Sequence, residues 1–267
     1  MLQFSYPGPD LSVSLHNHSC WSDGSAELEE VCRKGKEAGI RVLGLSDHYV
    51  AAPGKGYGSE VWSMELSRLN DYRKTLLKLR EQLEDDSFSL KIGLEVDFFF
   101  ENADCLLPKL AALPLDYLIG SVHYADTFPI DHSILDWQNL TEEEKEKICE
   151  KYYEKLEAAA LRKEFSFLGH LDLPKKFGLI DNVRYFPHAL RVLDNVAKTG
   201  MGMELNTAGW HKECNEQYPS LPILREAAKR RIPVIVNADA HDPAHLQRDF
   251  LHASEILLEA GYPKRSF

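Results

Sequence analysis

Short apolar segments alternate with amphipathic segments along the whole chain. Seven of the apolar runs have the length and residue types of buried β-strands. These predicted strands are Leu11–Leu15, Val42–Leu45, Phe88–Leu94, Leu115–Ile119, Phe165–Leu168, Met201–Leu205 and Ile232–Val236.

The segments between the predicted strands have helical spacing or are rich in strong helix formers. Two of them follow a residue type that favours a helix start, Ser25 before AELEE and Thr141 before EEEKEK. The predicted helices are Ala26–Ala38, Val61–Leu83, Cys105–Ala112, Thr141–Lys163, Pro187–Lys198, Leu221–Lys229 and Pro243–Ala260.

This alternation predicts an α/β protein with a mainly parallel sheet. Seven repeats without a glycine-rich nucleotide loop favour a closed barrel over an open, doubly wound sheet. No linker or repeat interrupts the pattern, so we expect one barrel domain over residues 1–267.

Two longer segments, Val50–Ser59 and Tyr124–Leu140, carry Gly, Pro and aromatic residues and are predicted to be active-site loops over one barrel face.

Composition and charge narrow the class of protein. The 267 residues include 31 Lys and Arg against 42 Asp and Glu, a net charge of −11, which makes general nucleic-acid binding unlikely to be the main function. Five widely spaced cysteines without a CxxC pair argue against a disulfide framework and against a cysteine-type zinc site. No apolar stretch is long enough for a membrane span and no signal-peptide pattern opens the chain, so we expect a cytoplasmic protein.

Polar residues suited to metal binding follow most of the predicted strands. Because the carboxyl ends of the strands of a parallel barrel share one face, residues some two hundred positions apart are expected to meet there. His16 and His18 form an HxH pair whose imidazoles point to one side, and Glu95 ends an apolar run where a lone carboxylate would be costly. Singly, each histidine is more often structural than a ligand, but the joint pattern is hard to explain that way.

Nine candidate metal ligands result from this pattern, more than the three or four of a mononuclear site. The count therefore favours two or three divalent ions, zinc, manganese or iron. The candidates are His16, His18, Asp23, His48, Glu95, His123, His170, Asp239 and His241.

The ordered motifs resemble the PHP family, named for polymerase and histidinol phosphatase. They are HNHSCWSDGS, LSDHYV, GLEVDFF, GSVHY, GHLDLPKKFG, ELNTAG and NADAHDP, and they span residues 16–243. GHLDLPKKFG and GSVHY are most similar to the histidinol-phosphate phosphatase branch. The resemblance implies a distorted (βα)7 barrel, similar to a TIM barrel, that holds up to three divalent metals.

The resemblance also implies how the ligands are shared. One metal would be bound by His16, His18, Glu95 and Asp239, a second by Glu95, His123 and His170, and a third by Asp23, His48 and His241. Asp23 stands where several histidinol phosphatases have a histidine, and its harder oxygen donor would favour iron or manganese over zinc at the third position.

These expectations together predict a metal-dependent phosphomonoesterase. In this hypothesis a bridging water of lowered pKa attacks phosphorus in line, and L-histidinol phosphate of histidine biosynthesis is the expected substrate. Asp239 and His241 are the candidate catalytic residues, and Lys176, Arg184 and Asn206 are candidate substrate contacts. Two alternatives are a PHP phosphoesterase acting on nucleotides or nucleic-acid ends, and a non-catalytic metal-binding barrel.

Overall fold

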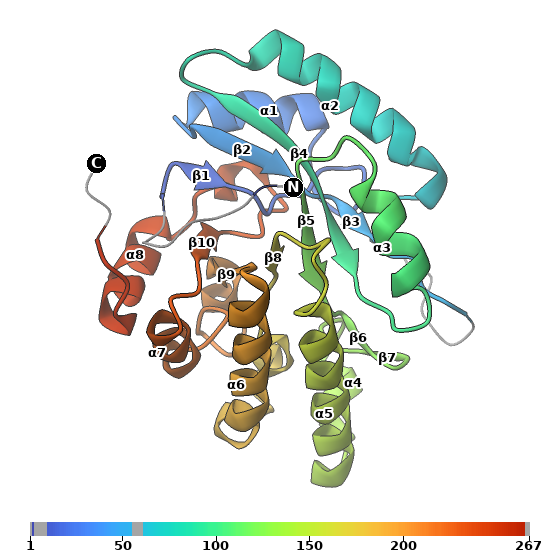
Figure 1. The fold of residues 1–267 in the computed structure, drawn as a ribbon, viewed down its shortest axis with the longest axis vertical. Coiled ribbons are helices and arrows are strands. Elements are labelled where there is room, and N and C mark those ends of the chain that lie inside the picture. The colour runs from blue at the N-terminus through green and yellow to red at the C-terminus, as the bar shows by residue number, and fades with distance from the viewer. Residues whose placement is uncertain (1, 3–9, 55–60, 265–267) are drawn as a thin grey trace.

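A nearly closed barrel of parallel strands forms the centre of the molecule (Figure 1). The computed structural model describes residue 2, residues 10–54 and residues 61–264, and it contains all seven predicted strands. Their order around the barrel follows the order in the chain. The strands are β1 (Val13–Ser14), β2 (Val42–Leu45), β4 (Ser89–Asp97), β5 (Tyr117–Ser121), β8 (Phe167–Leu168), β9 (Gly202–Asn206) and β10 (Val234–Asn237).

The second barrel position contains an interrupted strand. The short strand β3 (His48–Tyr49) also pairs with β4, and His48 lies opposite Glu95. Leu45 of β2 lies opposite Ile92 of β4, and three residues further along on each side His48 lies opposite Glu95. The short strand β3 therefore continues β2 in the same register against β4. Ser46 and Asp47 separate the two short strands, and His48 lies beside Glu95 at the carboxyl end of the barrel.

The barrel closes through the segments that follow β1 and β10. A parallel bridge joins Asn17 to Ala240, where His18 N donates to Ala240 O at 2.8 Å and Ala240 N donates to His16 O at 3.2 Å. The closing contacts therefore involve the residues next to the predicted ligands.

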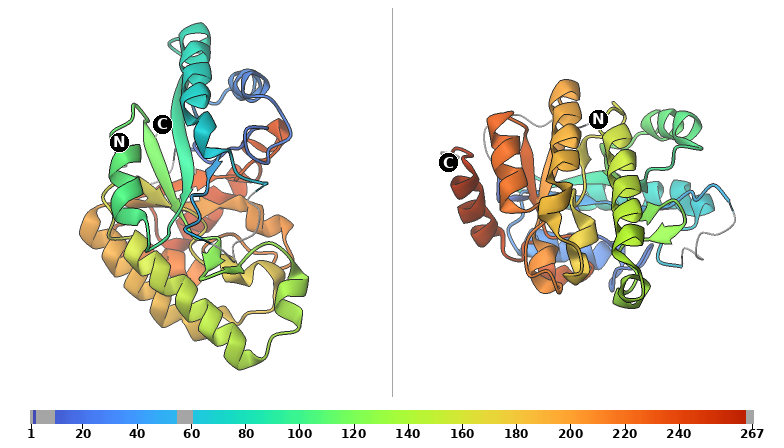
Figure 2. Two further views of the ribbon diagram at one scale, coloured as in Figure 1. Left: turned by 90° about the vertical axis from the view of Figure 1, so that its right-hand side faces the viewer. Right: turned by 90° about the horizontal axis from the view of Figure 1, so that it is seen from below.

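Helices cover the outside of the barrel (Figures 1 and 2). The predicted start of α5 is confirmed, since Thr141 and Glu144 form a reciprocal capping box. Ser25 is wrong as a start signal, because α1 has Glu27 as its N-cap and the Ser25 hydroxyl instead lies near Asp242. The helices that follow the strands are α1 (Leu28–Glu37), α2 (Leu69–Leu83), α3 (Ala103–Ala111), α5 (Glu142–Ala159), α6 (Asn182–Thr199), α7 (Leu221–Lys229) and α8 (Phe250–Ala260).

Two predicted helices begin later than expected. Residues Leu66–Arg68 form the 3₁₀ helix η1 before α2, and Pro243–His245 form η4 before α8. Asp249 has a φ of 62°, a left-handed conformation that separates η4 from α8. Two further 3₁₀ helices follow strands, η2 (Leu173–Phe177) after β8 and η3 (Thr207–His211) after β9.

The two predicted loops differ in how much of them the structure describes. Residues 124–140 contain a hairpin of β6 (Tyr124–Ala125) and β7 (Phe128–Pro129), followed by the short helix α4 (Ile134–Gln138). Residues 55–60 of the other loop lie outside the described residues.

None of the helices in the described part of the chain combines the length and the apolarity that crossing a membrane requires.

A small apolar cluster fills the barrel interior below the polar end. Tyr117 is fully buried there, and its hydroxyl donates to Leu15 O at 2.6 Å. Its ring occupies the space in which a Cβ at Gly44 or Gly93 would lie. Glycine at these two positions is therefore required by the ring.

We expect Gly93→Val to destabilise the protein by about 1–3 kcal/mol, because the added side chain overpacks the barrel interior against Tyr117. Urea unfolding followed by circular dichroism measures this change. Gly54→Val is the matched control, since none of the described residues beyond its chain neighbours has an atom within 4 Å of its Cβ position. Equal effects of the two substitutions would contradict the packing assigned to Tyr117.

Candidate metal centre

The nine predicted ligands converge on the carboxyl end of the barrel. His16 and His18 follow β1, His48 lies in β3, and Glu95 lies near the end of β4. The others follow β5, β8 and β10, except Asp23, which lies in the loop between β1 and α1. The predicted convergence of these side chains is confirmed by their distances.

Glu95 lies at the centre of this group and is almost fully buried. Its Oε2 lies 3.1 Å from His16 Nε2, 3.5 Å from His18 Nε2 and 2.8 Å from His48 Nδ1. This oxygen therefore faces three imidazoles at once.

The second oxygen of Glu95 faces the opposite side. Glu95 Oε1 accepts from Ser121 Oγ at 2.6 Å and lies 2.9 Å from His170 Nε2 and 3.6 Å from His123 Nε2. A carboxylate with histidines on both of its oxygens has the placement needed to bridge two cations.

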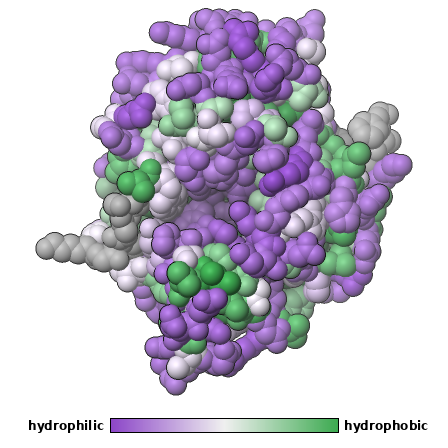
Figure 3. All heavy atoms as spheres, turned by 180° about the vertical axis from the view of Figure 1, so that it is seen from behind, coloured by the Kyte–Doolittle hydropathy of each residue, from purple (hydrophilic) through white to green (hydrophobic). Residues whose placement is uncertain are grey.

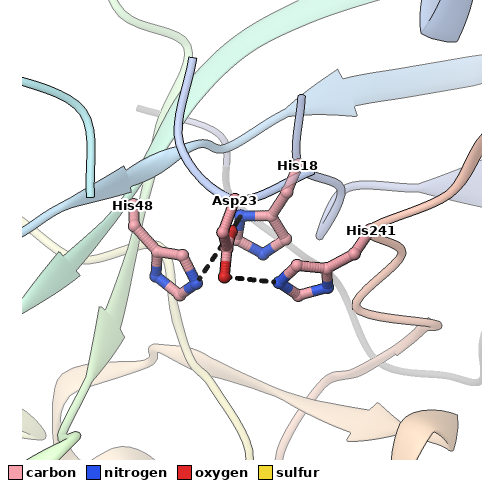
Figure 4. A group of neighbouring side chains, drawn as sticks. All are labelled: His18, Asp23, His48 and His241. Carbon is pink, nitrogen blue, oxygen red and sulfur yellow. Dashed lines mark hydrogen bonds and ion pairs between the residues drawn. The ribbon is translucent and has the colours of Figure 1, made fainter. Parts of the chain in front are cut away.

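Asp23 reaches into the outer part of the cluster and lies among three imidazoles (Figure 4). Its Oδ2 is 3.2 Å from His241 Nε2, and its Oδ1 is 3.7 Å from His48 Nε2 and 3.9 Å from His18 Nδ1. Asp47 accepts bonds from the backbone and hydroxyls of Ser19 and Ser22, which fixes the loop that carries Asp23.

The ligand atoms group differently from the sharing that the family resemblance implied. His18 joins the outer group, and His48 lies close to Glu95 as well as to Asp23. Asp239 Oδ1 lies 3.1 Å from His18 Nε2 and 3.5 Å from His16 Nε2, beside these groups. The three groups that are compact enough for an ion are His18, Asp23, His48 and His241; His16, His18 and Glu95; and His48, Glu95 and His123.

Carboxylates behind the cluster orient two of its imidazoles. His16 donates through Nδ1 to Glu204 Oε2 at 2.9 Å, and His123 donates through Nδ1 to Asp97 Oδ2 at 3.0 Å. Each bond leaves Nε2 as the nitrogen that faces Glu95. Glu204 and Asp97 therefore have the same supporting role.

We expect Glu204→Gln to weaken metal binding by about 10- to 100-fold, because the Nδ1–H of His16 loses its charged acceptor. Competition with a fluorescent zinc chelator measures this affinity. Glu213→Gln removes an equal charge on the surface and is the control. An unchanged zinc affinity in Glu204→Gln would contradict the role assigned to Glu204.

The cluster holds its carboxylates ionised. Burial would raise the pKa of Glu95, but the nearby His48 and His16 outweigh it and hold this pKa well below its usual value. The pKa of Asp239 is also held well below its usual value, since His16 and His18 outweigh the effect of burial. Burial, reinforced by His48, lowers the pKa of His18 to about 4, so its imidazole is neutral at pH 7 and available as a ligand.

The side chains fit divalent ions. Several buried atoms that face other members of the cluster have no hydrogen-bond partner among the described residues, namely His16 Nε2, His18 Nδ1, His48 Nδ1 and Glu95 Oε2. Unpaired buried polar atoms are costly in a folded protein, and a bound cation would satisfy them. Imidazole and carboxylate donors suit zinc, manganese and iron.

A cavity of about 920 Å³ opens beside the cluster and is lined by Asp23, His48, His123, His170, Asp239 and His241 on that side. The face of the molecule seen from behind is hollowed, with hydrophilic residues around the hollow (Figure 3). Three cationic side chains also line the cavity, Lys176, Lys212 and Arg248. Lys212 and Arg248 were not predicted, because neither belongs to a strand-end motif and only the folded loops bring them here.

The predicted substrate contacts have different positions. Lys176 lines the cavity, and its ammonium donates to Asp131. Asn206 is fully buried and donates to Asp239 Oδ2 at 3.1 Å, so it positions a candidate ligand. Arg184 is wrong as a contact, because it lies in α6 away from the cavity lining and pairs with Glu146 on the surface. Asp172, which follows His170 in the GHLDLPKKFG motif, is fully buried and pairs with Lys175.

Comparison with known proteins identifies the family. A model of the PHP domain matches residues 14–208, which is most of the chain. The matched segment begins at the last residue of β1 and contains every strand from β2 to β9. The chain belongs to the PHP family. The family resemblance predicted from the motifs is therefore confirmed.

Individual PHP relatives match almost end to end. A probable histidinol-phosphatase of Deinococcus radiodurans is 31% identical over 249 residues, which cover 92% of each chain. The histidinol-phosphatase of Bacillus subtilis is 23% identical over 270 residues, covering 92% of this chain and 97% of the relative. The structure of a histidinol phosphate phosphatase from Lactococcus lactis, complexed with zinc, L-histidinol and phosphate, has a TM-score of 0.77 at 17% identity and covers 94% of each chain, which confirms the PHP barrel fold.

Proposed function

We propose that this protein is a metal-dependent phosphomonoesterase that hydrolyses L-histidinol phosphate to L-histidinol and phosphate. The observation that carries the proposal is the convergence of six histidines and two aspartates around Glu95, beside a cavity with cationic residues. Relatives that align over nearly the whole chain are named histidinol-phosphatases, and this supports the choice of substrate.

The charge of the cluster supports binding of a phosphate monoester. With neutral imidazoles, Asp23, Glu95 and Asp239 give the centre a negative charge, which would repel a phosphate dianion. Two or three divalent ions would reverse this charge, offset that of the phosphate and lower the pKa of a bound water. The nine candidate ligands would hold these ions, with Glu95 shared between two of them.

The residues around the cluster have separate tasks in this proposal. Lys212 and Arg248 line the cavity and lie where they can contact phosphate oxygens. Asn206 and His18 hold the two oxygens of Asp239, whose low pKa keeps the carboxylate ionised, which suits the binding of a cation and does not suit proton donation. His241 lines the same cavity, and because its Nδ1 donates to the backbone carbonyl of Asp239, its Nε2 faces Asp23 as a candidate metal ligand.

The test is phosphate release by protein loaded with zinc, manganese or iron. The substrates are L-histidinol phosphate, nucleoside monophosphates, sugar phosphates and a short single-stranded DNA. We expect a strong preference for L-histidinol phosphate that a chelator abolishes. Activity on nucleotides or DNA alone, or none with any metal, would contradict the proposal.

A further inference from the structure

One carboxylate in the cavity has no part in the metal cluster. Among the described residues that line the cavity, the acidic ones are Asp23, Asp131 and Asp239, and only Asp131 is outside the nine candidate ligands. Asp131 follows β7 in the hairpin loop, where Ile130 N donates to His123 O at 2.8 Å. This backbone bond keeps Asp131 close to a candidate ligand on the cluster side of the cavity.

Lys176 binds Asp131 from one side only. Its Nζ donates to the backbone carbonyl of Asp131 at 2.6 Å and to Oδ2 at 3.1 Å. No donor among the described residues bonds to Oδ1 of the same carboxylate. Burial would raise the pKa of Asp131, but Lys176 and His123 outweigh it and keep the carboxylate ionised.

Aromatic side chains line the same part of the cavity. The rings of Trp62 and Tyr124 stack with centroids 6.5 Å apart, and Trp62 lies 5.5 Å from the ring of His123. Aromatic faces attract cations, and a neighbouring carboxylate adds a charged hydrogen-bond acceptor. A phosphate ester with an uncharged alcohol part can pack on the rings but has no cationic donor for the carboxylate of Asp131.

We propose that Asp131 is the residue that selects phosphate monoesters carrying a positive charge, by accepting a hydrogen bond from the substrate's ammonium or imidazolium at Oδ1 while Lys176 holds Oδ2. The inference rests on the proposed function and deepens it, since it assigns to Asp131 the selection of the cationic end of the substrate. The phosphate would lie at the metal cluster and the cationic end beside Asp131, Trp62 and Tyr124.

The test compares Asp131→Asn with the zinc-loaded wild type on L-histidinol phosphate and on p-nitrophenyl phosphate, which has no cation. We expect the ratio of the two kcat/KM values to fall about 10- to 100-fold, the effect of losing one hydrogen bond to a charged group. Asp126→Asn is the matched control, because Asp126 lies in the same hairpin, is exposed and has a φ of 50° that asparagine tolerates. Equal losses on both substrates would overturn the inference and leave Asp131 a structural role.

A second variant and a binding measurement separate this inference from the proposed function. Lys176→Met removes the side chain that holds Oδ2 but keeps the carboxylate of Asp131, so the ratio should fall by less than in Asp131→Asn, and a larger fall than in Asp131→Asn would overturn the inference. If the wild type hydrolyses no phosphate ester, the proposed function fails. Calorimetric titration of L-histidinol into zinc-loaded protein then decides: weaker binding by Asp131→Asn supports the inference, and equal binding, or none by the wild type, overturns it.

Discussion

Glu95→Gln is expected to lower phosphatase activity by at least about 1,000-fold, which corresponds to about 4 kcal/mol of lost transition-state stabilisation. The amide keeps the shape of the side chain but has no negative charge with which to bridge cations. Five histidines surround the two oxygens of Glu95, so its replacement affects every part of the cluster. Initial rates on L-histidinol phosphate, together with zinc content by mass spectrometry, measure the effect.

Glu101→Gln is the control for this substitution. Glu101 follows the same strand, is exposed and lies outside the cavity lining, so its loss of charge should leave activity and zinc content unchanged. A Glu95→Gln variant with wild-type zinc content and activity would show that Glu95 does not bind the metals.

Removal of the metals is expected to abolish activity and to destabilise the fold. A ligand present at 1,000 times its dissociation constant stabilises the folded state by about 4 kcal/mol. For a domain of this size each kcal/mol changes the midpoint of thermal unfolding by about 2–4 °C, so chelation should lower it by roughly 10 °C. Calorimetry before and after chelation measures the change, and re-addition of zinc should restore the midpoint.

The chelated protein should also lose stability as the pH rises. Burial would lower the pKa of His241, but the neighbouring Asp23 and Asp239 outweigh burial and raise this pKa to about 9. Burial would also lower the pKa of His123, but Asp97 and Glu95 outweigh it and raise this pKa to about 10. Protonation of a group whose pKa is higher in the folded protein stabilises the fold. This stabilisation is fully present below the pKa of 6.5 that the group has in the unfolded chain, and it is lost as the pH rises through the pKa of the folded protein. The unfolding midpoint of the chelated protein should therefore fall between pH 6.5 and pH 10, and a rise would contradict the contacts of both histidines.

The barrel and the ligands were predictable because each depends on a short segment. Every strand is a local apolar run, and parallel strands bring their carboxyl ends to one face whatever the loops do. His16 and Glu95 could thus be placed near one another from their strands alone. The sequence could also place Tyr124–Leu140 over the site, and Tyr124 and Asp131 do line the cavity.

The contacts that depend on loop and helix placement could not be predicted. Lys175, Lys176 and Arg184 are close in sequence, yet only Lys176 lines the cavity, because Lys175 turns to Asp172 and Arg184 lies on the surface of α6. His48 Nδ1 lies 2.8 Å from Glu95 while its Nε2 faces Asp23, a double contact that the spacing of the motifs does not indicate. Such details follow from backbone bends and side-chain rotation, which residue spacing does not record.

Anomalous diffraction at the zinc edge, from crystals of the zinc-loaded protein, tests the central claim most directly. The account predicts two or three zinc ions per chain, with Glu95 binding one ion through each of its oxygens and with histidine nitrogens completing the sites. A crystal with no zinc at this end of the barrel, or with zinc that Glu95 does not contact, would contradict it.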